Sequence, residues 1–399
     1  MGEPRVRVAV IGCGGIARAH LRGYRTFREH EPDLFAMPAV CDTVRASAES
    51  FADEVASFQG SRPKVYTRVD RMLAREELDG ADICTPHSLH HVNAIECLQA
   101  GLNVMVEKPI GITIRATKAI IKAAKQAKRF AATAENIRRG LSQRTGYWAI
   151  NEEGLIGQPL MFFMQYIGAQ DPARERHWHW RVDHWMGGGG MVMDSGAHFC
   201  DTVRYFYGDA ERVAAEVRQY RKWPHRKGKR LVNDDREDTW TATIVFESGM
   251  VGNWAWSQAL GGHDLSNVAT YGSEGCLVDD ADIFHGPHGS ARIVRNDGTV
   301  HPFSDLQEAF LKSLGPEGRR CLFPHDVYDG MALEIYDFLT AIADGRAPEI
   351  DAEAGLRAKA IAEAIFESGF AGKSVLLKDV LSGRVCGYQR PIDERCGLA

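Results

Sequence analysis

Short apolar runs alternate with helix-forming segments over the first third of the chain. The apolar runs have the length of buried strands, and the segments between them place alanine, leucine and isoleucine at helical spacing. We expect strands at Val6–Ile11, Ala39–Cys41, Ala81–Cys84, Asn103–Val106 and Phe130–Ala134, with helices at 15–29, 44–57, 88–100 and 113–129. This alternation is typical of βαβ units, so it predicts a doubly wound parallel sheet that binds a nucleotide.

The pattern changes after about residue 135. Longer runs alternate apolar and polar residues and are separated by glycine turns such as Ser248-Gly249, which favours antiparallel strands. Strands are expected at Leu160–Gly168, Thr239–Glu247, Met250–Trp256 and Leu265–Tyr271, and helices at 142–153, 326–344 and 352–369. A second domain with a largely antiparallel sheet follows from this pattern.

Composition favours a soluble globular protein. The 399 residues exceed one ordinary domain, and 44% are hydrophobic and 25% charged, as in chains with a buried core. The formal net charge of -5 gives no general attraction to nucleic acid or anionic membranes. No apolar run approaches the ~20 residues of a membrane span. Nine cysteines without a C-x-x-C pair favour reduced thiols and a cytoplasmic location.

One basic segment departs from this balance. Residues 221–230 carry six lysines and arginines around a tryptophan, which can indicate a nucleic-acid loop. Acidic residues follow at 234–238. We therefore expect an exposed, charge-compensated connection between strands, and no nucleic-acid partner.

A glycine-rich turn follows the first predicted strand. Residues 12–17 read Gly-Cys-Gly-Gly-Ile-Ala, the G-x-G-x-x-G/A form with alanine in the last place. Glycine lets the turn tighten and the backbone approach a pyrophosphate, whose charge meets N–H groups at the following helix start. The turn predicts a dinucleotide site with Gly12, Gly14, Gly15 and Ile16 at the cofactor.

An acidic residue follows the second predicted strand. Asp42 can accept hydrogen bonds from the ribose hydroxyls and would repel a 2′-phosphate, so NAD is favoured over NADP. Its distance from the glycine turn exceeds the usual ~20 residues, which predicts an extended crossover through 28–38. Arg45 can neutralise a phosphate, so NADP is the weaker alternative.

Polar residues also follow two later strands, at the edge where open α/β sheets bind ligands. Thr85, Pro86, His87 and His90 come after one strand, and Glu107-Lys108-Pro109 after the next. The histidines can line a site, or they can cap or pack on the following helix. The Lys108–Pro109 bond is a candidate cis peptide.

The second domain holds a further constellation. Four glycines, 187 to 190, precede Asp194 and His198. Helical spacing places these two side chains on one face, so a carboxylate and an imidazole can act together. A surface salt bridge or a helix cap is the alternative, but the glycines allow a ligand to approach closely.

An aromatic run lies just upstream, with tryptophans at 178, 180 and 185. Indole faces suit the C–H faces of a polyhydroxylated ring, although they can equally be core. Arg181 can recognise a carboxylate or lie on the surface. The histidines at 177, 179 and 184 lack a recognisable ligand spacing, so no metal site is expected.

The motifs together resemble the glucose-fructose oxidoreductase / inositol dehydrogenase / rhizopine catabolism (Gfo/Idh/MocA) oxidoreductases. The resemblance rests on the glycine turn, Glu107-Lys108-Pro109, and the glycine-rich Asp194-x-Gly196-x-His198 pattern, and it covers nearly the whole chain. It implies an α/β fold: an N-terminal Rossmann doubly wound parallel sheet in residues 1–135, then an α+β domain in 136–399. The second domain would carry a large open, mostly antiparallel sheet that pairs subunits into homodimers or homotetramers.

The resemblance also implies roles for individual residues. Lys108, Asp194 and His198 match the catalytic set. Expected cofactor contacts, including those predicted above, are Gly12, Gly14, Gly15, Ile16, Asp42, Arg45, Thr85, Pro86, His87, His90, Glu107, Lys108 and Asn136. Expected substrate contacts are Lys108, Arg138, Tyr166, Trp178, Trp180, Arg181, Asp194 and His198.

The expected function is reversible, NAD-dependent oxidation of a secondary hydroxyl on a sugar, glycoside or cyclitol. His198 would take the hydroxyl proton, Asp194 would orient it, and Lys108 would stabilise the developing alkoxide. One alternative is an NAD-dependent glycosidase that works by oxidation and elimination. A non-catalytic nucleotide-sensing regulator is the weaker alternative, because all three catalytic residues are present.

Overall fold

The chain divides into two compact units. The computed structural model describes residues 3–171, 174, 176–279, 286–287 and 290–398. Unit 1 comprises Met1–Arg139 and Arg320–Leu356, and unit 2 comprises Gly140–Arg319 and Arg357–Ala399.

Unit 1 is built on a six-stranded sheet in the order β3-β2-β1-β4-β5-β6, in which every pair of neighbours is parallel. The predicted doubly wound sheet is therefore confirmed. Its strands are β1 Val6–Ile11, β2 Phe35–Cys41, β3 Lys64–Tyr66, β4 Gly80–Ile83, β5 Asn103–Glu107 and β6 Ala131–Ala134. Its helices are α1 Gly15–His30, α2 Arg45–Gln59, α3 Val69–Leu73, α4 His87–Gln99, α5 Ile114–Ala127, η1 Ile137–Arg139, η4 Pro324–Asp326 and α11 Gly330–Asp344.

The extended crossover predicted for 28–38 is wrong. Helix α1 continues to His30, and β2 already begins at Phe35. Pro38 hid the start of this strand, because proline has no N–H to donate to a sheet. The pairing of β1 with β2 shifts register at this point, from Arg7↔Ala36 to Ala9↔Ala39, so the strand passes the proline without ending. The long interval before Asp42 is thus filled by regular structure.

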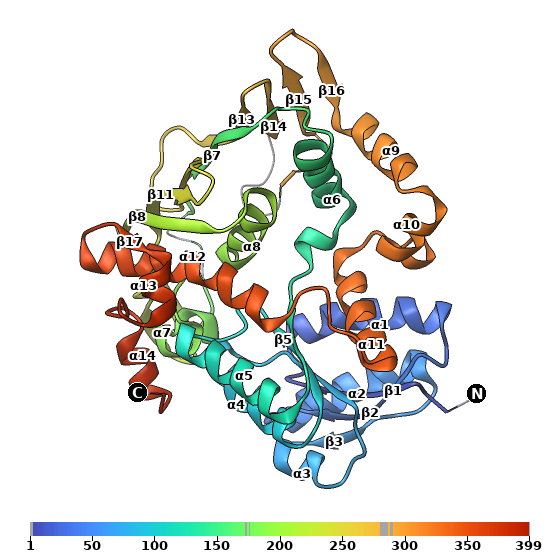
Figure 1. Cartoon of the computed structure of the whole chain (residues 1–399). Coiled ribbons are helices and arrows are strands. Elements are labelled where there is room, and N and C mark those ends of the chain that lie inside the picture. Colours follow the sequence, from blue (N-terminus) through green and yellow to red (C-terminus); the bar gives the residue numbers. More distant parts are fainter. Residues whose placement is uncertain (1–2, 172–173, 175, 280–285, 288–289, 399) are drawn as a thin grey trace. The chain divides into compact units, whose positions relative to one another are not determined.

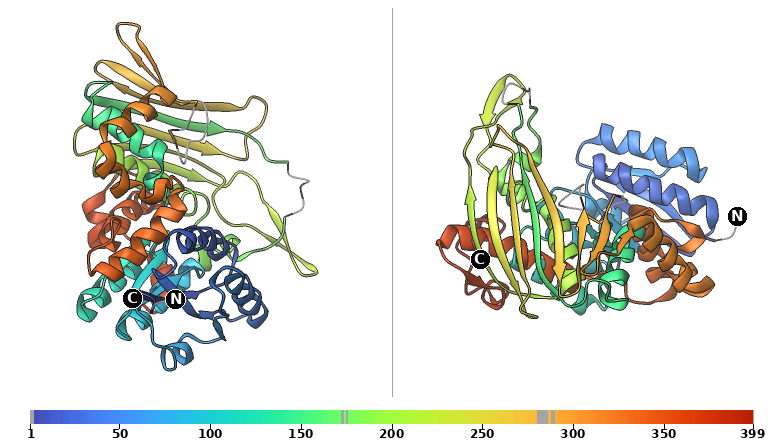
Figure 2. Two further views of the ribbon diagram at one scale, coloured as in Figure 1. Left: turned by 90° about the vertical axis from the view of Figure 1, so that its right-hand side faces the viewer. Right: turned by 90° about the horizontal axis from the view of Figure 1, so that it is seen from above.

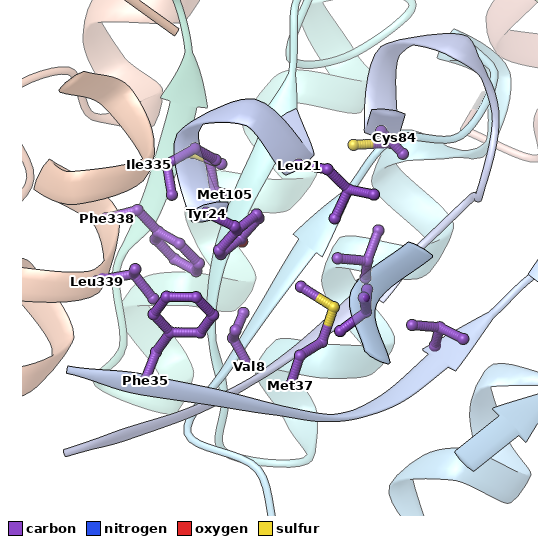
Figure 3. Close-up of a cluster of buried hydrophobic side chains, with 14 of the residues drawn as sticks. Val8, Leu21, Tyr24, Phe35, Met37, Cys84, Met105, Ile335, Phe338 and Leu339 are labelled. Carbon is purple, nitrogen blue, oxygen red and sulfur yellow. The ribbon is translucent and has the colours of Figure 1, made fainter. Parts of the chain in front are cut away.

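Helix α11 packs against α1 and completes the core of unit 1 (Figure 1). A Cβ added at Gly23 would lie 2.9 Å from the Ala332 Cα, so glycine lets the two helices approach closely. The rings of Phe27 and Tyr336 lie 4.3 Å apart. Figure 3 shows side chains of α11 beside those of α1 and β2 in one buried cluster, which includes Leu21, Tyr24, Phe35, Ile335, Phe338 and Leu339. These contacts explain why residues 320–356 associate with the nucleotide-binding sheet, although they follow the antiparallel strands in the chain.

Unit 2 contains a nine-stranded sheet in the order β16-β15-β14-β13-β7-β12-β11-β8-β17 (Figure 2). Only β7 and β12 pair in parallel, so the mostly antiparallel sheet is confirmed. The strands are β7 Pro159–Ile167, β8 Ala210–Arg218, β11 Thr239–Phe246, β12 Val251–Ser257, β13 Leu265–Gly272, β14 Gly275–Asp279, β15 Arg292–Arg295, β16 Val300–Pro302 and β17 Val375–Leu376.

The remaining helices lie wholly or partly in unit 2. They are α6 Leu141–Tyr147, the π-helix η2 Trp148–Glu152, η3 Trp180–Val182, α7 His184–Gly187, α8 Gly196–Tyr207, α9 Phe303–Ser313, α10 Gly315–Leu322, α12 Ala352–Ala371, α13 Leu377–Ser382 and α14 Arg390–Arg395. The basic segment forms an exposed hairpin of β9 Pro224–Lys227 and β10 Arg230–Asn233.

The two faces of the large sheet differ. On one face Phe199 of α8 stacks on Trp254 with ring centroids 3.8 Å apart, and it also contacts Phe162. The opposite face presents Met161 and its register neighbour Tyr271, which are 40% and 46% exposed. Because side chains alternate along a strand, α8 covers one face while the other keeps exposed apolar groups.

Candidate active site

The glycine turn of unit 1 has the backbone that a dinucleotide requires. Gly12 has φ +91°, and a Cβ there would lie 2.7 Å from the Cys84 carbonyl oxygen, so the turn needs glycine. Nothing lies within 4 Å of the Cβ positions of Gly14 and Gly15. No side chain caps the start of α1, and its first turn has no acidic residue. The turn therefore leaves room for a pyrophosphate at a helix N-terminus that favours negative charge.

Asp42 lies directly beside this turn. Its carboxylate accepts hydrogen bonds from the backbone N–H groups of Cys13 and Val44, each at 2.8 Å. Arg45, in contrast, forms an ion pair with Glu49 at 2.9 Å. A 2′-phosphate would meet the negative charge of Asp42, while the nearby arginine already has a carboxylate partner. These residues fit NAD better than NADP.

The ends of β4 and β5 are joined by His90. Its Nε2 lies 2.8 Å from the Thr85 carbonyl oxygen, and its Nδ1 lies 3.0 Å from that of Pro109. His87 is buried at the first position of α4, directly after Pro86. The two histidines thus lie in the first turn of α4, where His90 connects the ends of β4 and β5. The Lys108–Pro109 peptide bond is cis, as predicted.

Glu107 and Lys108 differ in their surroundings. Glu107 is the buried last residue of β5, and its Oε1 lies 3.1 Å from Nε2 of His20. Lys108, the next residue, is only partly buried. Asn136 and Arg138 are also partly buried and follow β6, around the short helix η1. Unit 1 therefore offers Lys108, Asn136 and Arg138 at least in part to solvent, while Glu107 is enclosed.

In unit 2, Asp194 and His198 lie at the start of α8. Asp194 precedes the helix, in a turn where its N–H donates to the Gly190 carbonyl oxygen at 3.0 Å. His198 lies in the first helical turn and is 9% exposed. The expectation that both residues belong to the helix is therefore wrong for Asp194, which lies in the turn that leads into it.

Arg181 contacts the Asp194 carboxylate, with its Nε 3.1 Å from Oδ2. The guanidinium also lies over the Trp180 ring, 4.3 Å from the centroid. Trp178 instead contacts Lys227, whose Nζ lies 3.6 Å from the ring centroid. Tyr166 is an exposed residue of β7. The structure thus brings Arg181, Trp180 and Asp194 together and gives Trp178 a different, cationic partner.

Glu237 is a residue that the sequence analysis missed. Its buried carboxylate accepts the N–H groups of Gly190 at 2.8 Å and Val192 at 3.0 Å. A Cβ on Gly190 would lie 2.7 Å from both carboxylate oxygens. Burial raises the pKa of Glu237 to about 7, although the two N–H donors lower it in part. Glu237 was counted among the acidic residues that balance the basic segment, whereas it holds the turn that leads to Asp194.

Comparison with known proteins identifies the chain. The oxidoreductase family profile for the NAD-binding Rossmann fold matches residues 6–134, and the profile for the C-terminal alpha/beta domain of the same family matches residues 151–377. The chain belongs to the Gfo/Idh/MocA oxidoreductase family. The matches agree with the parallel sheet of unit 1 and the mixed sheet of unit 2.

Relatives within the Gfo/Idh/MocA family include dehydrogenases of several polyols. D-apiose dehydrogenase of Paraburkholderia graminis is 24% identical over 385 residues, which are 94% of this chain and 91% of that protein. Myo-inositol 2-dehydrogenase of Thermotoga maritima is 25% identical over 386 residues, 94% of this chain and 100% of that protein. A glycosyl hydrolase family 109 protein of Shewanella baltica is 26% identical over 186 residues, 45% of this chain and 38% of that protein.

Solved structures show the same Gfo/Idh/MocA fold. A levoglucosan dehydrogenase in complex with NADH and levoglucosan superposes with a TM-score of 0.71 at 22% identity, covering 93% of this chain and 99% of that one. This likeness establishes the fold.

The histidines upstream of the glycines have other contacts in this Gfo/Idh/MocA protein. His184 Nδ1 lies 3.5 Å from the Tyr388 hydroxyl, and the His179 ring packs edge-on against His225. Across the part of the chain that the structure describes, close groups of three potential ligand atoms centre on His20.

Proposed function

We propose that the protein reversibly oxidises a secondary hydroxyl of a sugar, glycoside or cyclitol to a ketone with NAD. The observation that carries the proposal is the segment from Gly190 to His198. Its turn is held by a buried carboxylate, it presents Asp194 partly exposed, and it places His198 in the first turn of α8. A carboxylate and an imidazole so close in the chain suit proton transfer from an alcohol.

Bound NAD would supply the acceptor for the hydride that leaves the alcohol carbon. The hydroxyl proton would pass to the His198 imidazole as the C–H bond breaks. Lys108 would donate a hydrogen bond to the same oxygen and stabilise its developing negative charge.

Asp194 would bind a neighbouring hydroxyl and orient His198. Its contact with Arg181 supports this role, because the guanidinium holds one carboxylate oxygen and balances its charge. Arg181 also keeps the Trp180 ring beside it. An indole face and a charged polar group together suit a ring with apolar C–H faces and polar edges. We therefore include Trp180, Arg181, Trp178, Tyr166 and Arg138 among the substrate contacts.

NADH formation across a panel of inositols, aldoses, deoxy sugars and glycosides tests the proposal. At least one of these alcohols should reduce NAD, and His198→Asn should abolish that turnover while NADH still binds. Wild-type turnover by His198→Asn would overturn the assignment of the base.

A second candidate is a glycosidase that oxidises, eliminates and re-reduces with NAD retained. The partial match to a glycosyl hydrolase family 109 protein favours keeping it. Product analysis separates the two, because a dehydrogenase accumulates NADH whereas the glycosidase releases free sugar without net NADH. A non-catalytic regulator would bind NADH tightly and give neither product.

We further propose that subunits pair through the large sheet as a homodimer or homotetramer. The exposed Met161 and Tyr271 support this, since they lie side by side on the face opposite α8 and apolar patches on a sheet mark contact surfaces. Met161→Arg should reduce the mass measured by light scattering. A wild-type protein that elutes as a monomer would contradict the proposal.

We place the protein in the cytoplasm, with no nucleic-acid partner. Its nine cysteines are all free thiols, as expected in a reducing compartment. Among the helices that the structure describes, none is long and apolar enough to span a bilayer.

A further inference from the structure

A buried polar cluster lies inside unit 1, apart from the groups assigned to the reaction. At its centre is His20 of α1, which has no exposed surface. Around it lie Asp82 of β4, Cys84 just after that strand, Glu107 of β5 and Glu334 of α11, all buried. Buried charges are costly unless they are paired, so this cluster requires an explanation.

Both ring nitrogens of His20 face carboxylates. Nδ1 lies 2.9 Å from Asp82 Oδ2, and Nε2 lies 3.1 Å from Glu107 Oε1. Both ring nitrogens can donate to these oxygens only when the ring is an imidazolium. Burial opposes this charge, but Asp82 and Cys84 together outweigh it, so the pKa of His20 is raised well above its usual value.

Glu334 is the third carboxyl group beside His20. Its Oε1 lies 3.5 Å from His20 Nε2, and neither of its oxygens has a hydrogen-bond partner among the described residues. Burial raises the pKa of Glu334 well above its usual value. Burial therefore favours the protonated form of Glu334, and His20 lies within hydrogen-bond distance of the other two carboxyl groups, those of Asp82 and Glu107.

The position of the cluster links three segments of the proposed site. His20 lies in the second turn of α1, the helix that begins at the glycine turn. Asp82 lies near the end of β4, shortly before Thr85 and Pro86, and Glu107 immediately precedes Lys108. His20 thus connects α1, the helix that begins at the glycine turn, to the ends of β4 and β5, which carry expected cofactor contacts.

We propose that His20 is a positioning residue, which fixes Lys108 relative to the cofactor helix through its hydrogen bond to Glu107. The proposal rests on the function assigned above to Lys108. It does not require His20 to touch substrate or cofactor. As a result, binding of NAD at the start of α1 would change the position of Lys108 through the contact between His20 and Glu107.

Metal ligation is the alternative use of these atoms, because His20, Glu107 and Glu334 offer ligand atoms within 4.8 Å of one another. A metal ligand must present a lone pair, whereas both nitrogens of the imidazolium donate hydrogen bonds. The geometry therefore favours the proton-bearing ring.

The test compares His20→Gln with a matched control, Tyr24→Phe. Tyr24 is buried in the same cluster and donates to Asp82 at 3.2 Å, but no contact joins it to Glu107 among those described. Lysines are labelled as 13C-dimethylamines by reductive methylation, and the Lys108 resonance is assigned with Lys108→Arg. Binding of NADH is measured by its fluorescence, and neither readout requires a substrate.

In the wild type and in Tyr24→Phe, NADH should shift the Lys108 resonance. In His20→Gln, NADH should still bind with unchanged affinity, but the Lys108 shift should differ from that of the wild type, because Lys108 is no longer held in the same position. Once a substrate is known, kcat should fall by about 100-fold with little change in KM, as expected for a misplaced catalytic group. A wild-type response of Lys108 in His20→Gln would overturn the proposal, as would an equal change in Tyr24→Phe.

Further measurements separate a positioning role of His20 from loss of folding and from failure of the proposed function. If His20→Gln does not fold, Glu107→Gln replaces it, and an unaltered Lys108 response in that variant would overturn the proposal. A metal bound in equimolar amount by the wild type and lost in His20→Gln would also overturn it. Failure of every alcohol to reduce NAD would count against the proposed function alone, because the Lys108 signal is read without turnover.

Discussion

Arg181 reaches Asp194 with its Nε 3.1 Å from Oδ2, and the same guanidinium lies over Trp180. The pair is partly exposed, with about a quarter of the Asp194 side chain and a third of the Arg181 side chain open to solvent. A partly exposed ion pair adds little to stability, but it fixes the direction of a carboxylate. Arg181 therefore fixes the direction of the Asp194 carboxylate.

Arg181→Met should lower kcat/KM by about tenfold, or about 1.4 kcal/mol of transition-state stabilisation. The reason is that Asp194 would lose the ion pair with Arg181 that orients its carboxylate. Arg176→Met is the matched control, because Arg176 lies over Trp223 in a similar stacking contact 4.4 Å from the ring centroid. Steady-state kinetics with the best alcohol check the prediction, and equal losses in both variants would contradict it.

Replacement of Gly12 or Gly14 by alanine should have different effects on folding and on cofactor binding. Gly12→Ala should destabilise unit 1, because its φ of +91° and the Cys84 carbonyl at 2.7 Å leave no place for a Cβ. Gly14→Ala should fold normally, since its Cβ position has no neighbour within 4 Å. We expect it to weaken NADH binding by about tenfold, because the methyl group occupies space reserved for the pyrophosphate. Thermal melting and NADH fluorescence separate the two effects.

The preference for NAD over NADP should depend on the charge of Asp42 and on the ion pair between Arg45 and Glu49. Asp42→Asn removes the charge that opposes a 2′-phosphate, and Glu49→Gln frees Arg45. Arg62, the other partner of Glu49, would still pair with Asp53. The double variant should raise the affinity for NADPH relative to NADH by at least about tenfold. Dissociation constants for both nucleotides test this, and an unchanged ratio would show that Asp42 does not select the cofactor.

Glu237 should make stability depend on pH. Its pKa is raised to about 7 in the folded chain from 4.5, so the folded state retains a proton that the unfolded state has lost between these values. The contribution of Glu237 to stability therefore falls as pH rises through this window and is constant above it, with a total change of ~3 kcal/mol. Glu237→Gln should abolish this change.

Urea unfolding of both proteins at about pH 5 and about pH 8 measures the effect. The stability of Glu237→Gln relative to the wild type should increase between the two pH values. Glu211→Gln, at an exposed position of β8, is the control and should follow the wild type. A wild-type to Glu237→Gln difference that is the same at both pH values would refute the prediction.

The regular elements of unit 1 could be predicted because their signal is local. β1, Val6–Ile11, was predicted to the residue, and α1 and α5 to within two residues, since each has a strong apolar period between clear boundaries. β2 was predicted too short because Pro38 interrupts its apolar run. Short strands such as β15, Arg292–Arg295, carry too many charged residues for an alternating pattern to be visible.

In the candidate site, too, the residues that could be predicted are those with a local sequence signal. Gly12 and Asp42 follow strand ends, so their places could be inferred from the chain alone. Contacts between residues distant in sequence could not, because they depend on tertiary packing. Glu237 meets Gly190 across 47 residues of chain. For His20, the available signal was a polar residue on the apolar face of an amphipathic helix, beside Leu21 and Tyr24.

The packing of α11 against α1 has a consequence for synthesis. A ribosome releases the six strands of the nucleotide-binding sheet long before Gly330–Asp344 emerges, so the apolar surface around Leu21 and Tyr24 remains uncovered for most of translation. A premature stop between Asn136 and the start of α11 would leave that surface permanently uncovered. Such a truncated chain would lose cofactor binding and aggregate, even though every residue expected to contact NAD had been made.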